Sequence, residues 1–549
     1  MKLRTTVRFV AFYVVLTFLL AACGSGSAAP NVSDTTSNPP LRQSGEVAMV
    51  EAEMAAADMS DETMLSEPTA EDDLEAPDYN TEEYDRIYEN PFLAAQSNPL
   101  STFSIDVDTA SYSNSRRFIN SSQLPPPDAV RIEEFINYFD YDYPQPDGEQ
   151  PFSVNTELSV APWNPSHYLV QIGIQGVDVA TEDLPPSNLV FLLDVSGSMN
   201  DANKLPLVKQ GFRLLVDQLT ERDRVAIVVY AGSSGLVLPP TSGADKATIM
   251  AAIDNLDAGG STAGGEGIQL AYDVAQESFI DGGNNRVVLA TDGDFNVGPS
   301  SDGELVRLIE EKREAGVFLS ILGFGTGNYK DSKMEQLADK GNGNYAYIDG
   351  IREAEKVLVS EMAGTLLTIA KDVKIQVEFN PAKVQGYRLI GFENRLLAKE
   401  DFNDDTKDAG ELGAGHTVTA LYELVPVGVE MPTGVDDLIY QESNISEAAQ
   451  QSNELMTVKL RYKQPDGDTS QLISQPVLEG ELPLDSASDD FRFAAAVAEF
   501  GMLLRDSEHK GTASFDHVLS MAEGAKGPDL AGYRAEFITL VQTARLLSR

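Results

Sequence analysis

Short apolar runs alternate with amphipathic stretches between residues 188 and 359, and this alternation strongly limits the folds open to the chain. Short continuous apolar strands separated by helices are typical of a parallel sheet that helices cover on both faces. We therefore predict an α/β domain with a doubly wound, mostly parallel sheet over residues 188–362. The apolar runs are Leu189–Leu193, Val225–Val229, Val287–Ala290 and Phe318–Phe324, and the amphipathic stretches include Leu205–Leu219, Ile268–Phe279 and Leu305–Glu314.

Oxygen-bearing side chains follow two of these predicted strands. Asp194, Ser196 and Ser198 come directly after the first apolar run, Asp292 follows the third, and Thr262 lies in a glycine-rich stretch between them. Loops at the carboxyl ends of parallel strands form the ligand crevice, so we expect Asp194 and Asp292 to reach one edge of the sheet. Hydroxyl and carboxylate oxygens are the hard ligands that Mg²⁺ takes, and Mn²⁺ and Ca²⁺ use overlapping ligand types. The pattern predicts a divalent metal site.

These residues resemble the metal-ion-dependent adhesion site of the von Willebrand factor type A (VWA) family. The D-x-S-x-S at 194–198, the single Thr262 and the T-D-G at 291–293 stand in that family's order and spacing. The resemblance implies a VWA fold in which Ser196 and Ser198 bind the metal directly and Asp194 acts largely through water. It implies that Thr262 supplies a third hydroxyl and that Asp292 supplies the second charge, mostly through water. It also implies a protein partner whose Asp or Glu carboxylate fills the remaining metal position.

Strand-like segments flank the α/β region on both sides. They alternate apolar and polar residues, as a half-buried strand does. We infer one β-sandwich, formed by residues 151–187 and 363–484, that is interrupted by the inserted α/β domain. Separate small β units before and after the insertion are the alternative. The segments that carry this pattern are 154–160, 169–174, 373–379, 387–392, 417–424 and 454–462.

Helical patterns mark two further regions. Residues 90–150 contain a predicted short helix from Ala110 to Asn120 and, after a proline break, a second helix with one apolar face. Residues 485–549 also have helical spacing. We expect an N-terminal helical and extended segment and a small α-helical C-terminal region that docks on the rest. From residue 90 to the end, the layout resembles a bacterial group of VWA lipoproteins.

The first residues resemble an export signal. Three basic residues precede an apolar run from Phe9 to Leu20, and the sequence L-A-A-C-G that follows looks like a bacterial lipobox. The resemblance implies a lipoprotein signal peptide at residues 1–22 and diacylation of Cys23. Residues 23–89 are rich in acidic residues and poor in apolar ones, which predicts a disordered acidic tether. We therefore expect a lipid-anchored protein on the exported side of the cell membrane or cell envelope.

Charge and cysteine content exclude several classes of function. The formal net charge is −46, from 86 acidic and 40 basic residues, and phosphate contacts need clustered Lys and Arg. We therefore expect no nucleic-acid partner. Cys23 is the only cysteine, so disulfides, thiol catalysis beyond the signal region and cysteine-based zinc sites are excluded.

A second acidic motif lies at Asp106 and Asp108. A strand that ends in D-x-D-x-T begins the haloacid-dehalogenase-like phosphatases, in which the first Asp is the nucleophile and the second the acid and base beside Mg²⁺. Here a proline break and strand-like segments follow, instead of the α/β domain that such an enzyme needs. We expect a structural or cation-binding turn and no enzymatic activity. A phosphatase that uses Asp106 and Asp108 is the most distant alternative.

The sequence as a whole predicts a lipid-anchored binding protein. Its inserted domain would hold Mg²⁺, or Mn²⁺ or Ca²⁺, and would grip an acidic side chain of a protein partner during adhesion or assembly. The main alternative is a structural scaffold of an envelope complex, in which the metal only stabilises the fold. Metal dependence of partner capture separates these two hypotheses.

Overall fold

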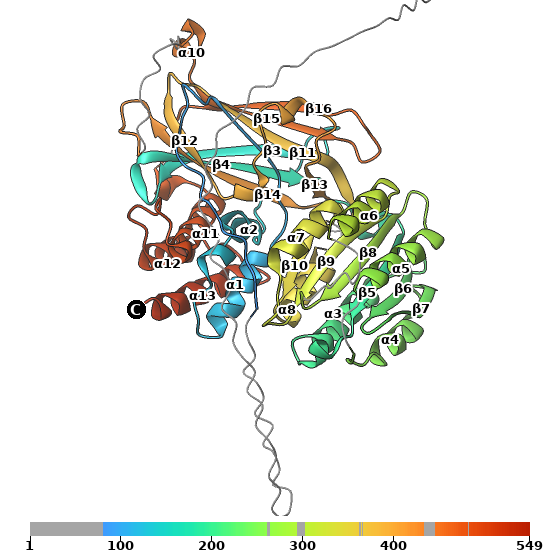
Figure 1. Ribbon diagram of the computed structural model, residues 1–549. Helices are drawn as coiled ribbons and strands as arrows, with labels where there is room; N and C mark the ends of the chain where they lie inside the picture. The colour runs from blue at the N-terminus through green and yellow to red at the C-terminus, as the bar shows by residue number, and fades with distance from the viewer. Residues whose placement is uncertain are drawn as a thin grey trace, which may run out of the picture. The chain divides into compact units, whose positions relative to one another are not determined.

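The α/β region forms a six-stranded sheet in the computed structural model, which describes residues 81–260, 264–293, 302–361, 364, 366–432, 445–480 and 483–549. The strand order is β10-β9-β8-β5-β6-β7 (Figure 1). Neighbouring strands are parallel, except that β7 runs antiparallel to β6 at one edge. The strands are β5 (Ser187–Asp194), β6 (Arg224–Tyr230), β7 (Ser234–Ser242), β8 (Asn284–Thr291), β9 (Phe318–Phe324) and β10 (Tyr345–Ile348).

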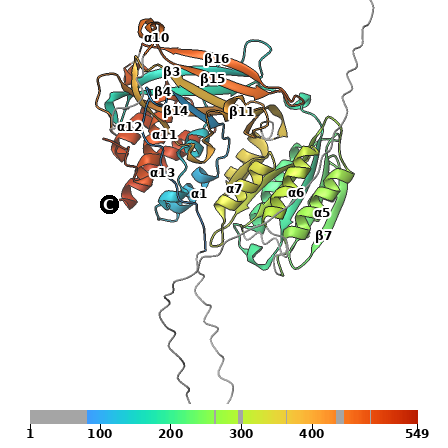
Figure 2. The same cartoon turned by 45° about the horizontal axis from the view of Figure 1, so that its top comes forward.

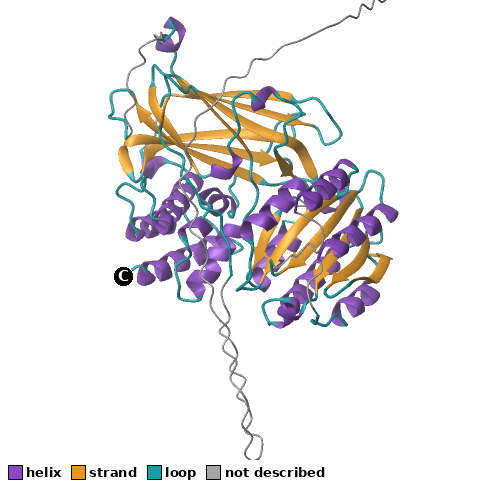
Figure 3. Ribbon diagram, in the orientation of Figure 1, coloured by secondary structure: helices purple, strands orange, loops and turns teal. Residues whose placement is uncertain are grey.

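Helices cover both faces of this sheet (Figure 3). Successive side chains of a strand point to opposite faces, so Leu189, Phe191 and Leu193 enter one core while Val190 and Leu192 enter the other. Helices α3, α4 and α8 supply the first core, and α5, α6 and α7 supply the second. The predicted doubly wound sheet is confirmed. The helices are α3 (Leu205–Gln218), α4 (Lys246–Asp254), α5 (Gly264–Glu277), α6 (Asp302–Glu314), α7 (Asp331–Lys340) and α8 (Ile351–Glu355).

Two antiparallel sheets form the β-sandwich (Figure 2). One has the order β1-β12-β14-β4-β3, and the other has the order β13-β11-β15-β16, with β2 also paired to β11. Apolar residues of both sheets share one core. The strands are β1 (Leu93–Ala94), β2 (Leu100–Ser104), β3 (Phe152–Ala161), β4 (Asn164–Gly176), β11 (Thr368–Phe379), β12 (Val384–Ile390), β13 (Gly410–Gly413), β14 (Thr417–Pro426), β15 (Glu454–Lys463) and β16 (Gln471–Leu478).

The α/β domain is inserted between strands of this sandwich. Strand β4 ends before the insertion and β14 lies after it, yet the two pair from Thr417 opposite Gln175 to Leu424 opposite Tyr168. Strands on either side of the insertion therefore belong to one sheet. The prediction of one interrupted sandwich is confirmed, and the alternative of separate β units is wrong.

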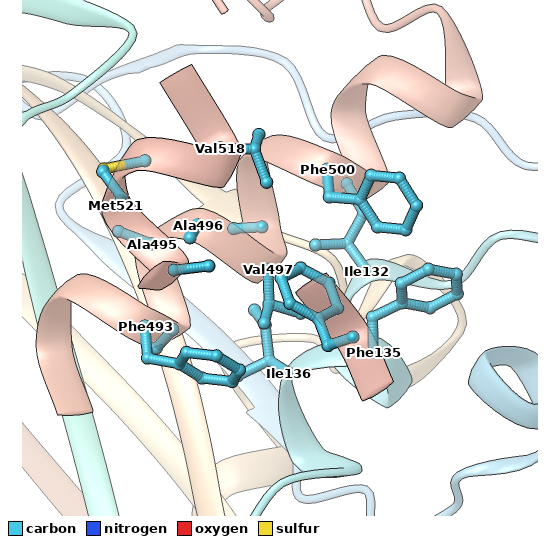
Figure 4. Close-up of a cluster of buried hydrophobic side chains, with 14 of the residues drawn as sticks. Ile132, Phe135, Ile136, Phe493, Ala495, Ala496, Val497, Phe500, Val518 and Met521 are labelled. Carbon is cyan, nitrogen blue, oxygen red and sulfur yellow. The ribbon is translucent and has the colours of Figure 1, made fainter. Parts of the chain in front are cut away.

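Helices from both ends of the described chain share one core. Ile132, Phe135 and Ile136 of α2 lie with Val497 and Phe500 of α11 (Figure 4). The N-terminal and C-terminal helical regions, which the sequence suggested as separate parts, thus bury their apolar faces against each other. The helices are α1 (Ala110–Asn120), α2 (Ile132–Asn137), α11 (Asp489–Arg505), α12 (Phe515–Gly524) and α13 (Tyr533–Leu547), and a short helix α10 (Glu447–Gln451) precedes β15.

The ordered structure begins before residue 90. The Glu83 amide donates to the Tyr329 carbonyl at 3.0 Å, and Arg117 forms an ion pair with Glu82 at 2.9 Å. Residues 81–89, at the end of the predicted tether, therefore contact the folded part of the chain. The acidic character of the tether suggested repulsion, but Glu82 finds a basic partner on α1, and such a partner cannot be identified from the composition of the segment alone.

Candidate metal centre

The carboxyl ends of β5 and β8 meet at the point where the strand order reverses. From β5 the chain continues to β6 and β7 on one side, and it later returns to β8, β9 and β10 on the other. Ligands of open α/β sheets bind at such a switch point. Asp194 is the last residue of β5, Asp292 follows the last residue of β8, and the register places Leu193 beside Ala290. The two predicted carboxylates therefore reach the same edge.

Asp194 is fully buried and held by three hydrogen bonds. Its Oδ1 accepts from the Ser196 amide at 2.9 Å, and its Oδ2 accepts from the hydroxyls of Tyr230 at 3.2 Å and Thr291 at 3.3 Å. Burial raises the pKa of Asp194 to about 6, against the opposing effect of the hydrogen bonds from Ser196, while the nearby Asp292 charge adds to the rise. A bound cation would favour the ionised form of this carboxylate.

Two serine hydroxyls lie together beside Asp194. The Oγ atoms of Ser196 and Ser198 are 3.0 Å apart, and Ser196 is buried whereas Ser198 is exposed. The Gly197 amide donates to the Gly260 carbonyl at 3.0 Å, which joins this loop to the glycine-rich loop. Thr262 lies just beyond that contact and outside the described residues. The structure thus brings the start of its loop to the site.

Asp292 is buried with an internal cation beside it. Its Oδ2 accepts from the Lys204 ammonium at 2.9 Å. Lys204 precedes α3, and its aliphatic stem lies against Gly325, where a Cβ would clash with the Lys204 Cε. Gly325 has a φ of +76°, so glycine suits this position for two reasons. The ammonium offsets part of the negative charge at the strand edge.

Sequence reasoning missed Lys204, Tyr230 and Thr291 at this site. Tyr230 ends β6, directly beside β5, so the strand-end rule that selected Asp194 could also have selected it. Thr291 stood in the T-D-G motif without a role of its own. Lys204 gave no signal, because its approach to Asp292 depends on how the loop before α3 folds.

The donor set fits a hard divalent cation. We call Asp194, Ser196, Ser198 and Asp292 the strand-edge site. They present carboxylate and hydroxyl oxygens, which hard cations such as Mg²⁺ prefer over nitrogen or sulfur ligands. These four residues would hold the cation, together with Thr262 if its loop completes the set.

Asp106 and Asp108 lie elsewhere, in a buried turn after β2. The Arg395 Nη2 contacts Asp106 Oδ1 at 3.2 Å and Asp108 Oδ2 at 3.3 Å, and the Tyr345 amide donates to Asp108 at 2.8 Å. Burial raises the pKa of Asp108, and the Asp106 charge adds to this rise. Strand β2 pairs antiparallel with β11 in the sandwich, unlike the parallel strand that precedes a phosphatase nucleophile. This setting favours the structural or cation-binding turn.

The predicted export signal, Cys23 and most of the predicted tether lie outside the described residues. Within the described part of the chain, no helix combines the length and the apolar character that crossing a membrane requires.

Comparison with protein families assigns three segments. Residues 188–357 match the von Willebrand factor type A domain, and residues 78–171 match a family described as von Willebrand factor. Residues 364–547 match the family described as "Uncharacterized protein YfbK, C-terminal". The inserted α/β domain is therefore a VWA domain.

Two curated relatives show how far the similarity extends. The uncharacterized protein YfbK of Escherichia coli (strain K12) is 48% identical over 471 residues, which cover 84% of this chain and 81% of the relative. The uncharacterized protein sll0103 of Synechocystis is 30% identical over 169 residues, which cover 31% of this chain and 39% of the relative. The first similarity therefore spans most of both chains.

Solved structures with related folds include two bacterial proteins and one from mussel byssus. A von Willebrand factor type A protein from Catenulispora acidiphila is 14% identical, with a TM-score of 0.38 over 72% of this chain and 91% of that one. BatB from Bacteroides thetaiotaomicron is 23% identical, with a TM-score of 0.28 over 32% and 97%. Proximal thread matrix protein 1 from the mussel byssus, with a zinc-occupied metal-ion-dependent adhesion site (MIDAS) motif, is 25% identical, with a TM-score of 0.28 over 34% of this chain and 46% of that one.

Proposed function

This chain belongs to the family of the Escherichia coli protein YfbK, and we propose that it is a binding protein that grips an acidic side chain of a protein partner through a divalent cation. The cation, Mg²⁺ in first place with Mn²⁺ or Ca²⁺ as substitutes, would be held at the strand-edge site of its VWA domain. One observation carries the proposal. Two buried carboxylates and two serine hydroxyls meet at the switch point of the sheet, where a ligand can approach.

The residues of the strand-edge site have different roles in binding the cation. Ser196 and Ser198 offer neutral oxygens, and the exposed Ser198 marks the side from which a partner approaches. Asp194 is kept in one orientation by Tyr230 and by its own loop. When bound, the cation supplies a positive centre that attracts an anionic ligand. Because Lys204 neutralises part of the charge of Asp292, the site leaves such a cation electrophilic.

The net charge of the chain supports a role for the cation in recognition. At −46 overall, the protein repels an acidic partner over much of its surface. A bound divalent cation would create a local positive feature at the strand edge. Specificity for the partner would then depend on one of its carboxylates reaching the cation. The negative charge on the rest of the surface would oppose non-specific contact with other acidic proteins.

Anchoring to the cell envelope is the second part of the proposal. The L-A-A-C-G sequence at Cys23 supports lipid attachment, and the acidic residues after it support a tether that holds the folded part away from the membrane. We propose a non-enzymatic role.

Capture from detergent-solubilised envelope tests the proposed function. The bait is the full chain in Mg²⁺, in chelator, and as Asp194→Ala in Mg²⁺, with Asp201→Ala as a matched control at an exposed acid on the same loop. We expect a protein retained by the wild type and by Asp201→Ala in Mg²⁺, and lost in the other two conditions. Equal retention in all four would contradict the proposal and favour the scaffold alternative, in which the metal only stabilises the fold.

A further inference from the structure

Three buried carboxylates from separate parts of the molecule converge outside the strand-edge site. Asp106 follows β2 of the sandwich, Glu134 lies on α2, and Glu335 lies on α7 of the VWA domain. One oxygen from each lies within 4.8 Å of the others. All three residues are buried, with exposed fractions of 4%, 1% and 6%. We call Asp106, Glu134 and Glu335 the junction cluster.

The charges around the junction cluster do not balance within the described residues. Two guanidinium groups lie there, those of Arg131 and Arg395. Together they form ion pairs with six carboxylates. With all groups ionised, six negative charges face two positive ones, and five of the six carboxylates are buried, whereas Asp339 is partly exposed. Such an excess is costly unless protons or a cation offset it. The six carboxylates are Asp106, Asp108, Glu134, Asp331, Glu335 and Asp339.

Several carboxylate oxygens at the cluster and beside it accept no hydrogen bond from the described residues, which favours a bound cation. Asp106 Oδ2 and both carboxylate oxygens of Glu133 are buried without a hydrogen-bond partner among the described residues. Glu133 is 1% exposed, and it lines the same cavity of about 270 Å³ as Glu335 and Arg131.

Cavities adjoin the cluster on two sides. Asp106 lines a second cavity, of about 450 Å³, together with Asp108, Asp339 and Arg395. The junction cluster thus contributes residues to two cavities, one on the Asp106 side and one on the Glu133 side.

We propose that Asp106, Glu134 and Glu335 bind a divalent cation, of which Ca²⁺ is the favoured class, and that this cation fastens the VWA domain to α2 and the sandwich. The donors are all carboxylate oxygens. Ca²⁺ accepts mono- and bidentate carboxylates in flexible geometry, whereas Mg²⁺ demands near-octahedral ligands and retains waters. The site shares no residue with the strand-edge site and goes beyond the proposed function.

Calcium titration of the full chain tests this site. Isothermal calorimetry is run on the Asp194→Ala background, which removes the strand-edge site, with Asp106→Asn or Glu134→Gln added. Glu378→Gln, an exposed glutamate on β11, is the matched control. We expect one Ca²⁺ bound in the background and in the control, and affinity lowered by at least about tenfold in the other two variants. Equal Ca²⁺ binding in all four proteins, or none in the background, would overturn the proposal.

Thermal melting guards against a variant that merely fails to fold. Without divalent cations, Asp106→Asn should melt at or above the temperature of its background, because it removes one excess negative charge. With Ca²⁺, the background should gain stability and the variant should not. If Asp106→Asn is unfolded, Glu134→Gln gives the same comparison. A Ca²⁺-induced gain of equal size in background and variants would contradict a site at the junction cluster.

Discussion

The strand-edge site and the junction cluster are both built on buried carboxylates, but their surroundings differ. At the strand edge, Asp194 and Asp292 lie with hydroxyl groups and one ammonium. At the junction cluster, six carboxylates lie with two guanidinium groups. The strand edge draws its residues from one domain, whereas the junction cluster draws them from three parts of the molecule.

This difference indicates different uses for a cation. The strand-edge site includes an exposed residue, Ser198, so a ligand from another molecule can complete it. The junction cluster is enclosed by elements of this chain, so a cation there would join elements that are distant in sequence. The two sites therefore differ in solvent exposure and in where their residues come from, more than in their number of carboxylates. An exposed site can bind another molecule, whereas an enclosed site joins parts of this chain.

The largest expected change in Mg²⁺ affinity comes from a substitution that separates the two sites. Asp292→Asn should weaken Mg²⁺ binding roughly 100-fold, because it removes a charge from the strand edge while keeping an acceptor for Lys204. Asp106→Asn should leave Mg²⁺ binding unchanged. Calorimetry with Mg²⁺ on both variants checks this, and equal weakening in both would mean that the two sites act as one.

Removal of a guanidinium group from the junction cluster should destabilise the fold strongly. Arg131 is buried and pairs with Asp331 at 2.7 Å and Glu335 at 2.8 Å. Arg131→Ala should cost about 3–5 kcal/mol, because it leaves buried charges uncompensated. Arg213→Ala, which breaks an exposed pair with Asp254, should cost only about 0–1 kcal/mol. Urea unfolding measures the loss in the free energy of unfolding for each variant. Similar losses for Arg131→Ala and Arg213→Ala would argue against a charged interior.

A half-buried histidine, His416, lies outside both sites and makes the stability of the fold depend on pH. Burial, with a smaller effect of the Lys356 charge, lowers the pKa of His416 from 6.5 to about 4. Between these values the unfolded chain takes up a proton that the folded chain does not, so stability should decrease as pH falls from 6.5 to about 4.

His416→Gln should remove this part of the pH dependence. The difference should be on the order of 1 kcal/mol in the free energy of unfolding between pH 6.5 and pH 5. Urea unfolding at the two pH values measures it. Parallel profiles for the wild type and the variant would show that His416 titrates normally, and the two cation sites could then be compared at lower pH.

The smallest expected change in Mg²⁺ affinity comes from a residue that supports the strand-edge site. Tyr230→Phe removes the hydroxyl that donates to Asp194 at 3.2 Å, one of the three hydrogen bonds to this carboxylate. Mg²⁺ affinity should fall about tenfold, with Ca²⁺ binding at the junction cluster unaffected. An equal loss at both sites in calorimetry would point to a general loosening of the fold instead.

Local sequence rules predicted the strand-edge site and the interrupted sandwich. Asp194 and Asp292 were found because parallel strands end at a common edge, and the sandwich was found because alternation returns after the insertion. The structure adds that β7 runs antiparallel to β6 and that Glu82 forms an ion pair with Arg117 of α1. Binding of metal at the strand edge stays a prediction.

The junction cluster could not be predicted as a whole. Asp106 was singled out as part of a structural or cation-binding turn, but Glu134 and Glu335 carried no motif. Their approach depends on the packing of α2 and α7 beside the turn after β2, and no local pattern describes that packing. Arg131 and Arg395 likewise reach the cluster only through the tertiary fold.

Diffraction from crystals of the full chain soaked with Mn²⁺ tests the central claim most directly, because an anomalous difference map locates the ion. We predict a peak about 2.0–2.3 Å from the hydroxyl oxygens of Ser196 and Ser198, with Asp194 and Asp292 around it and one position open to solvent or to a neighbouring carboxylate. A map with no peak at the strand edge, or a peak there enclosed by this chain alone, would contradict the account.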